Sequence, residues 1–196
     1  MRISWEQLSQ NIESCRACGL ASGCLHKVPG QGDPRAPLML IGEGPGRQED
    51  LEGLAFVGPA GQLLTRMLAA ISLPRDRVYI CNVVKCRPPN NRQPTPEEMD
   101  ACLPHLRGQA ALVRPRVILL LGATAVAAVL GTQERITRCR GQWFERKGTH
   151  IIATYHPSAL LRDPGKKRAA WEDLQCLRQR LIELSLYPDL LKEDRP

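Results

Sequence analysis

Cysteine is the residue type whose spacing most directly suggests chemistry in this chain. Cys15 and Cys18 form a CxxC pair near the N-terminus, and Cys86 and Cys102 flank a proline-rich stretch. Four thiolates can hold either a tetrahedral zinc ion or an iron–sulfur cluster. The fifteen residues between the second pair form a wider arm than a zinc ribbon uses, which favours the larger cluster. The alternative is that Cys86 and Cys102 are buried thiols unrelated to the CxxC pair.

Polar and aromatic residues that follow apolar runs form the second group of candidates. The glycine-rich segment Gly42–Gly46 ends one run, Asn82 ends the next, and His156 follows the last and precedes a proline. Phe56 lies in a loop of small residues, where an aromatic ring could stack on a base. Each feature also has an ordinary interpretation: a tight turn, a buried amide, a structural histidine, or a hydrophobe folded into the core. Their occurrence at three strand ends favours a shared site.

Four short apolar runs would position these residues. The runs are continuous rather than alternating, which is typical of strands buried on both faces of a parallel sheet. Helical patterns lie between them at Gly61–Ile71 and Ala123–Leu130. Strand alternating with helix predicts an α/β fold, a three-layer αβα sandwich with a central four-stranded parallel sheet, whose ligands bind at the carboxyl ends of the strands. The four runs are Pro37–Gly42, Val78–Val84, Val117–Leu121 and Ile151–Tyr155.

Helices are expected near both ends of the chain. Ser4 with Gln7 resembles a capping box, and an apolar stripe near the C-terminus repeats at helical spacing, so we expect it to pack in the core. The segment Arg87–Pro96 has too many prolines for regular structure and is expected to be a long, functional loop. No repeat or linker is visible, so we expect residues 1–196 to form a single domain. The stripe consists of Trp171, Leu174, Leu177, Leu181 and Leu184.

Composition narrows the function classes. Of the 196 residues 43% are hydrophobic, which excludes a disordered chain, and no apolar window is long enough to span a membrane. The polar, amphipathic N-terminus is unlike a signal peptide, so we expect a cytoplasmic protein whose eight cysteines are metal ligands or buried thiols rather than disulfides. The net charge of +7 favours polyanions, above all nucleic acid, although many ordinary soluble proteins are also basic. The glycine spacing matches neither GxGxxG nor GK[ST], so dinucleotide and P-loop nucleotide binding are not supported.

In combination these motifs resemble the uracil-DNA glycosylases that carry a four-iron four-sulfur cluster. The resemblance runs in order from Cys15 to about Trp171 and covers most of the chain. It implies that Cys15, Cys18, Cys86 and Cys102 ligate a structural 4Fe-4S cluster that orders the loop between the last two ligands. The remaining thiols, at positions 24, 81, 139 and 176, are then core or incidental. The matching segments are Gly42–Gly46 with Glu49-Asp50, Phe56–Gly61, Asn82–Pro89 and His156–Ser158.

The resemblance also implies roles for the residues at the strand ends. Uracil would be flipped out of DNA and stacked on Phe56, while Asn82 pairs with O4 and N3–H and so rejects cytosine. His156 would stabilise charge on uracil O2 as the N-glycosidic bond breaks. Glu43 and Gly44 would contact the base. The best-known uracil glycosylases orient the attacking water with an aspartate where this chain has Gly44, so Glu49 is our candidate for that task, with Glu43 beside it.

Residues after His156 would contact DNA. One of Leu160 and Leu161 would wedge into the base stack, and four cations would contact phosphates, unless they are simply a solvated charge run. A related branch links covalently to DNA through a histidine, but no histidine follows His156 here. We expect a monomer that acts on uracil-containing DNA and binds no membrane. The four cations are Arg162, Lys166, Lys167 and Arg168.

Two other functions compete with the glycosylase. The first is a non-catalytic nucleic-acid-binding module that keeps the fold and the cluster. The second is a zinc-stabilised α/β protein that acts on a small molecule. Both predict that no base is released from uracil-containing DNA, and they differ from each other in the metal bound.

Overall fold

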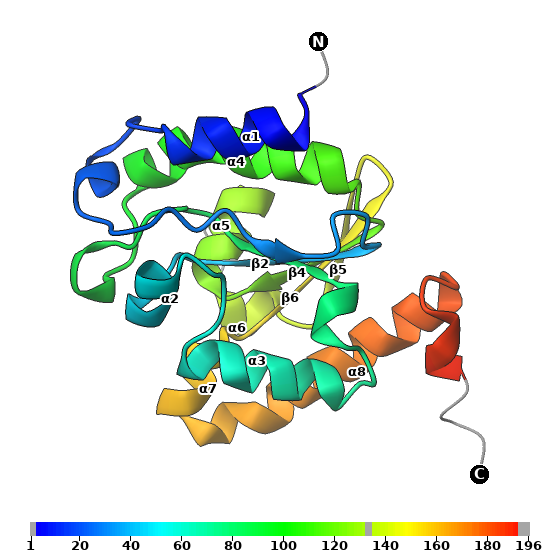
Figure 1. Cartoon of the computed structure of the whole chain (residues 1–196). Coiled ribbons are helices and arrows are strands. Elements are labelled where there is room, and N and C mark those ends of the chain that lie inside the picture. Colours follow the sequence, from blue (N-terminus) through cyan, green and yellow to red (C-terminus); the bar gives the residue numbers. More distant parts are fainter. Residues whose placement is uncertain (1–2, 132–134, 192–196) are drawn as a thin grey trace.

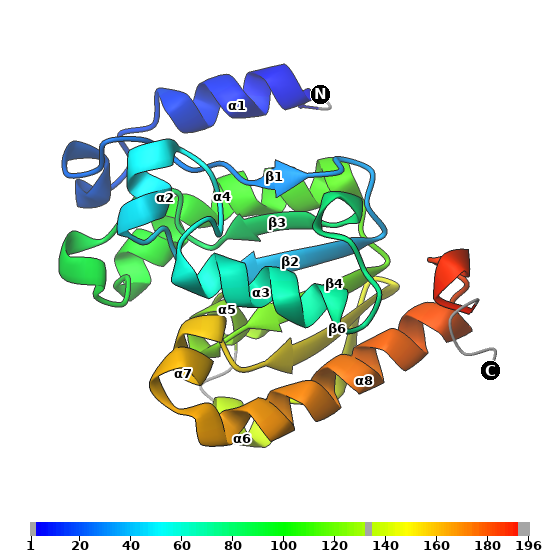
Figure 2. The same cartoon turned by 60° about the horizontal axis from the view of Figure 1, so that its bottom comes forward.

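The fold is built around a six-stranded sheet in a computed structural model that describes residues 3–131 and 135–191. The strand order is β1-β3-β2-β4-β6-β5. The four inner strands are parallel to one another, and the two edge strands run antiparallel to their neighbours (Figure 2). The bounds are β1 Gln31–Gly32, β2 Leu38–Gly42, β3 Tyr79–Asn82, β4 Val117–Leu121, β5 Trp143–Arg146 and β6 Thr149–Thr154.

Helices cover both faces of this sheet (Figure 1). On one face lie α1 (Trp5–Glu13), α4 (Pro96–Val113) and α5 (Ala123–Leu130), and on the other lie α3 (Pro59–Ala69), α7 (Pro157–Arg162) and α8 (Lys167–Glu183). The shorter helices are α2 (Arg47–Glu52) and α6 (Ile136–Cys139), and single 3-10 turns occur at Gly19–Ser22, Arg75–Arg77, Pro89–Asn91, Pro164–Lys166 and Pro188–Leu191. The α/β class and the three layers predicted from the sequence are therefore confirmed.

The inner strands are buried on both faces, as their continuous apolar runs predict. Leu38 and Leu40 of β2 pack with α3 and α8, whereas Met39 and Ile41 pack on the opposite side with α4 and α5. Successive side chains of a strand point to opposite faces, so each strand of this kind contributes to two cores at once. The carboxyl ends of these parallel strands meet at one edge of the sheet and present the loops that follow them.

The structure corrects three expectations about the elements. The sheet has two short antiparallel edge strands, β1 and β5, beyond the four predicted ones. The helix α4 begins at the last residue of the proline-rich segment Arg87–Pro96. The stripe on α8 is core at Leu174, Leu177 and Leu181, but Trp171 is 41% exposed. Among the described residues no helix has the length and apolar character that a membrane span requires.

Candidate active site

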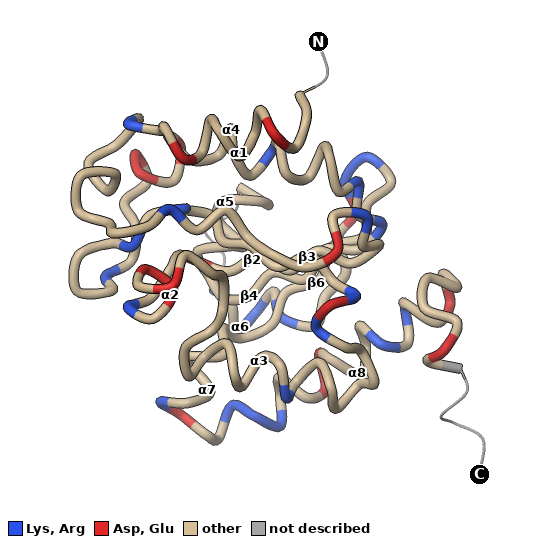
Figure 3. The backbone as a smooth tube through the Cα atoms, in the orientation of Figure 1, with Lys and Arg blue, Asp and Glu red and all other residues tan. Residues whose placement is uncertain are grey.

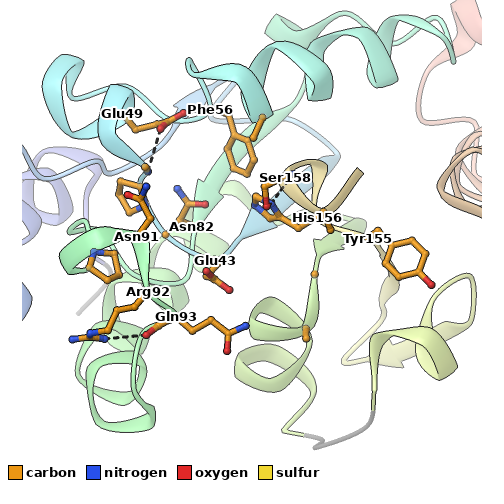
Figure 4. A pocket seen from close by; sticks show the side chains of 18 of the residues that line it. Glu43, Glu49, Phe56, Asn82, Asn91, Arg92, Gln93, Tyr155, His156 and Ser158 are labelled. Atoms are coloured by element: carbon orange, nitrogen blue, oxygen red, sulfur yellow. Dashed lines mark hydrogen bonds between the residues drawn. The ribbon is translucent and has the colours of Figure 1, made fainter. Parts of the chain in front are cut away.

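A pocket of about 440 Å³ opens where the parallel strands end. It is lined by residues that follow β2, β4 and β6 and by the last residue of β3, as the rule for open α/β sheets predicts. Figure 4 shows Glu43, Asn82 and His156, which come from the ends of three different strands, around the same hollow. The residues predicted from the sequence to bind base or water all contribute to this lining: Glu43, Gly44, Glu49, Phe56, Asn82 and His156.

Asn82 presents an unpaired acceptor to the pocket. It is the last residue of β3 and lies opposite Gly42 in the parallel ladder with β2. Its side chain is 2% exposed, and its Oδ1 atom is buried with no hydrogen-bond partner among the described residues. A Cβ atom on Gly42 would lie 2.5 Å from this Oδ1 and 2.5 Å from Cζ of Phe56. Glycine is therefore required at position 42, because any side chain there would collide with both.

His156 presents an unpaired donor. The residue caps α7, and its Nδ1 accepts a hydrogen bond from the backbone N–H of Ser158 at 3.2 Å and lies 2.8 Å from the Ser158 hydroxyl. A backbone N–H can only donate, so Nδ1 must be unprotonated and the neutral ring carries its proton on Nε2. That Nε2 is buried and has no partner in the described structure. Burial, and secondarily the charge of Arg162, lower the pKa of His156 to about 4, so the ring is neutral at pH 7.

Phe56 supplies a flat apolar wall beside His156. The two ring centroids are 5.7 Å apart, with the planes inclined by 34°. Phe56 has a positive φ of 54°. Gly61 approaches its backbone so closely that a Cβ would fall 1.8 Å from the Phe56 carbonyl oxygen. The small residues after Phe56 thus let the helix α3 start against the loop and hold the ring in place.

Glu43 follows β2 directly and points into the pocket (Figure 4). Its carboxylate accepts a short hydrogen bond from the hydroxyl of Thr124, which lies in the first turn of α5. The bond crosses from the loop after β2 to the loop after β4. It therefore fixes the direction of the Glu43 carboxylate before any ligand is bound.

Glu49 ties two loops together. One carboxylate oxygen accepts the backbone N–H of Val57 at 3.0 Å and of Gly58 at 2.9 Å, and the other accepts that of Gly46 at 3.1 Å. An ionised carboxylate has about four acceptor positions, so three are taken by the protein. One acceptor position is left over, on a residue that lines the pocket.

The loop between Cys86 and Cys102 forms another wall. Asn91, Arg92 and Gln93 line the pocket, and Arg92 pairs with Glu98 of α4 at 2.6 Å. The expectation that this loop is functional rested on its length and prolines, and its position beside the pocket agrees with that. Which of its residues face the pocket could not be read from the sequence.

The segment after His156 separates the two candidate wedge residues. Leu160 is 2% exposed and packs in the core, so the structure excludes it from contact with DNA. Leu161 is 44% exposed. Arg162 lines the mouth of the pocket. Lys and Arg residues are frequent along the backbone from the end of α7 into the start of α8 (Figure 3). There Lys166 pairs with Asp163 at 3.1 Å, Arg168 pairs with Glu172 at 3.5 Å, and Lys167 is exposed.

The four predicted metal ligands line one small cavity. Two of them, Cys86 and Cys102, flank the loop that carries Asn91, Arg92 and Gln93. Cys15 and Cys18 follow α1, Cys86 follows β3, and Cys102 lies on α4. The backbone N–H of Lys85 donates to the Cys102 sulfur at 3.3 Å. Burial raises the pKa of Cys102, and the charge of Lys85 opposes that rise. Within the described ranges no three His, Cys, Asp or Glu side chains are arranged around the position of a single metal ion.

One further thiol lies next to Cys86. Burial raises the pKa of Cys86, and a hydrogen bond with Cys24 raises it further. Cys24 is thus a neighbour of a predicted ligand, although nothing in its sequence context separated it from the incidental thiols.

Comparison with known proteins identifies the family. Residues 29–175 match the uracil DNA glycosylase superfamily. The type-4 uracil-DNA glycosylase of Archaeoglobus fulgidus is 45% identical over 169 residues, which cover 82% of this chain and 85% of the relative. The chain belongs to this superfamily. The type-4 enzymes of Thermotoga maritima and Sulfurisphaera tokodaii are 44% and 39% identical over 176 and 193 residues, covering 87% and 94% of this chain and 91% and 88% of the relatives.

Several pocket residues of this uracil-DNA glycosylase were not found from its sequence. Thr124 and Ser158 orient the side chains of Glu43 and His156, and Tyr155 lines the pocket without a role assigned in advance. The position of Ser158 two residues after His156 offered a signal. The side chain of an N-cap residue accepts a hydrogen bond from the backbone N–H two or three residues later, so His156 could be expected to contact Ser158. Thr124 offered none, because its contact joins residues 81 positions apart.

Proposed function

We propose that this chain removes uracil from DNA by flipping the nucleotide into the pocket and hydrolysing its N-glycosidic bond. The observation that carries the proposal is the pair of buried atoms without partners, Oδ1 of Asn82 and Nε2 of His156. Buried polar atoms are nearly always hydrogen-bonded, so two unpaired ones in one pocket indicate a ligand. They offer one acceptor and one donor, and uracil carries its N3–H donor beside its O2 acceptor.

This pattern selects uracil over cytosine. Oδ1 of Asn82 accepts from N3–H, its amide N–H donates to O4, and Nε2–H of His156 donates to O2. Cytosine has a lone pair at N3 and an amino group at position 4, so acceptor would face acceptor and donor would face donor. A mismatched buried polar group costs about 1–3 kcal/mol. Two mismatches on one edge give strong discrimination from one side chain.

Bond cleavage leaves positive charge on the sugar and negative charge on the base. The electron pair of the C1′–N1 bond passes to uracil, and charge accumulates on O2, where His156 donates its hydrogen bond. A preorganised donor of this kind contributes about 3–4 kcal/mol to the transition state. Because His156 is neutral with a pKa of about 4, it stabilises the uracil anion as a donor rather than protonating it. A water molecule oriented by the free position of Glu49, or by Glu43, then adds its oxygen to C1′. The proton that it loses passes through solvent to the uracil anion.

Binding of the flipped nucleotide uses the remaining residues. Phe56 stacks on the uracil ring, and the backbone of Glu43 and Gly44 contacts its edge. Leu161 fills the space that uracil leaves in the base stack, which repays part of the unstacking energy of a few kcal/mol. Arg162 with the lysines and arginine that follow contacts phosphates. The chain works as a monomeric, single-domain protein in the cytoplasm, where thiols remain reduced.

Cys15, Cys18, Cys86 and Cys102 hold a 4Fe-4S cluster. Their chemistry fits it: four thiols line one cavity, a backbone N–H already donates to one sulfur, and a lysine stands beside them. When bound, the cluster would have a structural role. It would connect the two ends of the loop whose residues Asn91, Arg92 and Gln93 line the pocket.

The decisive experiment measures free uracil released from a uracil-containing oligonucleotide, in EDTA and with no metal added. We expect release from uracil but not from cytosine in the same sequence, and a loss of at least about 100-fold in Asn82→Ala from the hydrogen bonds removed. DNA binding without base release would instead support the non-catalytic module. Metal analysis of the same sample distinguishes iron from zinc, and zinc would overturn the cluster.

A further inference from the structure

Lys85 is the largest side chain that the described fold buries completely, with 1% of it exposed. It lies between β3 and Cys86. Its ammonium donates to the backbone carbonyl oxygen of Asn82 at 2.5 Å and to Oε1 of Gln109 at 2.6 Å. In residues 3–131 and 135–191 no carboxylate lies within ion-pair distance of it. A buried cation without a counter-ion is costly, so a negative group must offset it.

Gln109 orients this ammonium but cannot neutralise it. The residue lies on α4 and is fully buried, and its amide nitrogen donates to the Pro29 carbonyl at 2.5 Å and to the Tyr79 hydroxyl at 2.9 Å. Both ends of the amide are therefore used, and its oxygen is held facing Lys85. The position of the ammonium is thus set by two contacts, one with the end of β3 and one with α4.

Sulfur supplies the missing negative charge. Lys85 lines the same small cavity as Cys15, Cys18, Cys86 and Cys102. Lys85 also donates its own backbone N–H to the Cys102 sulfur. Cys102 is a ligand in the proposed cluster, and a ligating thiol is deprotonated. Four thiolates around the cluster give it net negative charge, beside a lysine that has no other anion within the described residues.

The ammonium of Lys85 also donates a hydrogen bond to Asn82, the residue proposed to bind the edge of uracil. Asn82 ends β3, and the ladder with β2 continues only through Val83 and Val84, whose N–H groups donate to Gly42 and Glu43. The carbonyl of Asn82 is held by the ammonium of Lys85. Without it, this buried carbonyl would lose its charged donor, and the Asn82–Val83 peptide would be held on one side only, by the hydrogen bond from the Val83 N–H to Gly42. A tilt of this peptide would shift the Asn82 side chain from the position that faces uracil.

We propose that Lys85 is a positioning residue that couples the two sites: its charge is balanced by the cluster, and its ammonium fixes Asn82 for reading uracil. The second half rests on the proposed function. The first half concerns only the metal centre. Because the two halves predict different measurements, they can be tested apart.

The test compares Lys85→Met with Lys27→Met and Gln109→Glu. Lys27 lines the same cavity, and no hydrogen bond joins it to Asn82 in the described structure. A carboxylate in place of the Gln109 amide would give Lys85 an internal anion, but it would lose the bonds donated to Pro29 and Tyr79, so this variant is compared by its potential alone. The measurements are iron content, the midpoint potential of the cluster by a titration followed by electron paramagnetic resonance, and kcat and KM for uracil and cytosine oligonucleotides.

We expect Lys85→Met to lower the midpoint potential, because removal of a positive charge disfavours the reduced cluster. We also expect it to lower kcat/KM for uracil by about 10- to 100-fold, the effect of one buried hydrogen bond to a charged group. Lys27→Met and Gln109→Glu should also lower the potential. Lys27→Met should keep kcat/KM within about twofold of wild type, since Lys27 makes no hydrogen bond with Asn82 in the described structure.

Unchanged kcat/KM in folded, iron-loaded Lys85→Met would overturn the link to Asn82, and an unchanged potential would overturn the charge balance. If Lys85→Met does not fold, Gln109→Glu decides the charge balance by its potential. Lys85→Gln, which keeps a polar side chain but loses the charged donor to Asn82, then decides the link by kcat/KM, and an unchanged value would overturn it. Failure of the proposed function looks different. Wild-type protein would then release no uracil, and the potentials would still test the first half.

Discussion

The pocket and the cysteine cavity lie at the two ends of the segment from Asn82 to Cys86. Among the described residues, the pocket lacks hydrogen-bond partners, and the cavity lacks a negative charge. The pocket has one acceptor and one neutral donor without partners, on Asn82 and His156. The cavity has four thiols and a buried ammonium without a carboxylate in the described ranges. The first deficit requires a neutral ligand with complementary hydrogen bonds, and the second requires an anionic one. A base and an iron–sulfur cluster meet these two requirements.

The two regions also differ in how they are assembled. The pocket is set by backbone at adjacent strand ends, where Gly42 lets Asn82 and Phe56 approach each other. The cavity joins the end of α1, the loop after β3 and the helix α4, which are far apart in sequence. Strand ends in a packed sheet hold their positions through the core, whereas three separate segments need a shared ligand to hold them. We therefore expect mutations to affect chemistry in the pocket and folding in the cavity.

The largest effect is expected from His156→Ala. Removal of the donor to O2 should lower kcat about 100- to 1000-fold. The cost in stability should be about 1 kcal/mol, because the ring also caps α7. Ser158→Ala is the matched control: it removes the hydroxyl but keeps the backbone N–H that sets the tautomer, so it should lose about tenfold or less. Equal losses in the two variants would count against Nε2 as the donor. Single-turnover kinetics and thermal unfolding measure both quantities.

Next in size is Cys102→Ser, which tests the other region. We expect iron to be lost and the melting temperature to fall, since binding of a structural metal centre contributes directly to folding. Uracil release should fall with it, because the loop between Cys86 and Cys102 forms a wall of the pocket. Cys176→Ser changes an exposed thiol and should leave all three quantities unchanged. A full iron content in Cys102→Ser would remove that residue from the ligand set.

A smaller effect is expected from Gly42→Ala, which adds one methyl group between Asn82 and Phe56. Strand β2 is central and paired on both sides, so the backbone cannot move away. Overpacking of this kind costs about 1–3 kcal/mol, and displacement of Asn82 should reduce kcat/KM for uracil by about tenfold or more. The control is Gly19→Ala, because a Cβ there meets nothing within 4 Å. Wild-type kcat/KM in Gly42→Ala would show that the pocket is less rigid than its geometry indicates.

Much of this organisation was predictable because the signals are local. Continuous apolar runs identified the four inner strands, and the residues at their ends identified the pocket. The helix α4 was not predicted because it starts at a proline and contains Pro104, and proline normally indicates the absence of a helix. It packs against α1 and α5 and carries Cys102. The strands β1 and β5 were missed because they are short or partly exposed edges. Periodicity cannot reveal these cases, since tertiary contacts decide them.

Side-chain roles were less predictable than positions. Helical spacing placed Trp171 in the same stripe as Leu174, but only the structure shows that its position on α8 is exposed. Leu160 and Leu161 are adjacent residues of the same type, and the direction in which each leaves α7 decides which of them is core. Glu49 was chosen as a water ligand from its charge, and its three backbone hydrogen bonds could not be foreseen. Contacts of this kind join loops whose approach depends on the whole fold.

The smallest expected effect is the pH dependence of folding stability that His156 contributes. It tests the neutral donor in the pocket. The pKa of His156 is about 4 in the folded chain and about 6.5 when unfolded, so between these values the unfolded state binds more protons. His156 thus disfavours folding as pH falls through 6.5 toward 4 and has no effect above 7. The contribution should reach about 1 kcal/mol at pH 6. Denaturant unfolding of wild type and His156→Ala from pH 5 to 8 isolates it, because the other histidines are common to both. A stability difference between the two proteins that stays constant over this range would show that His156 does not titrate as a buried, neutral donor.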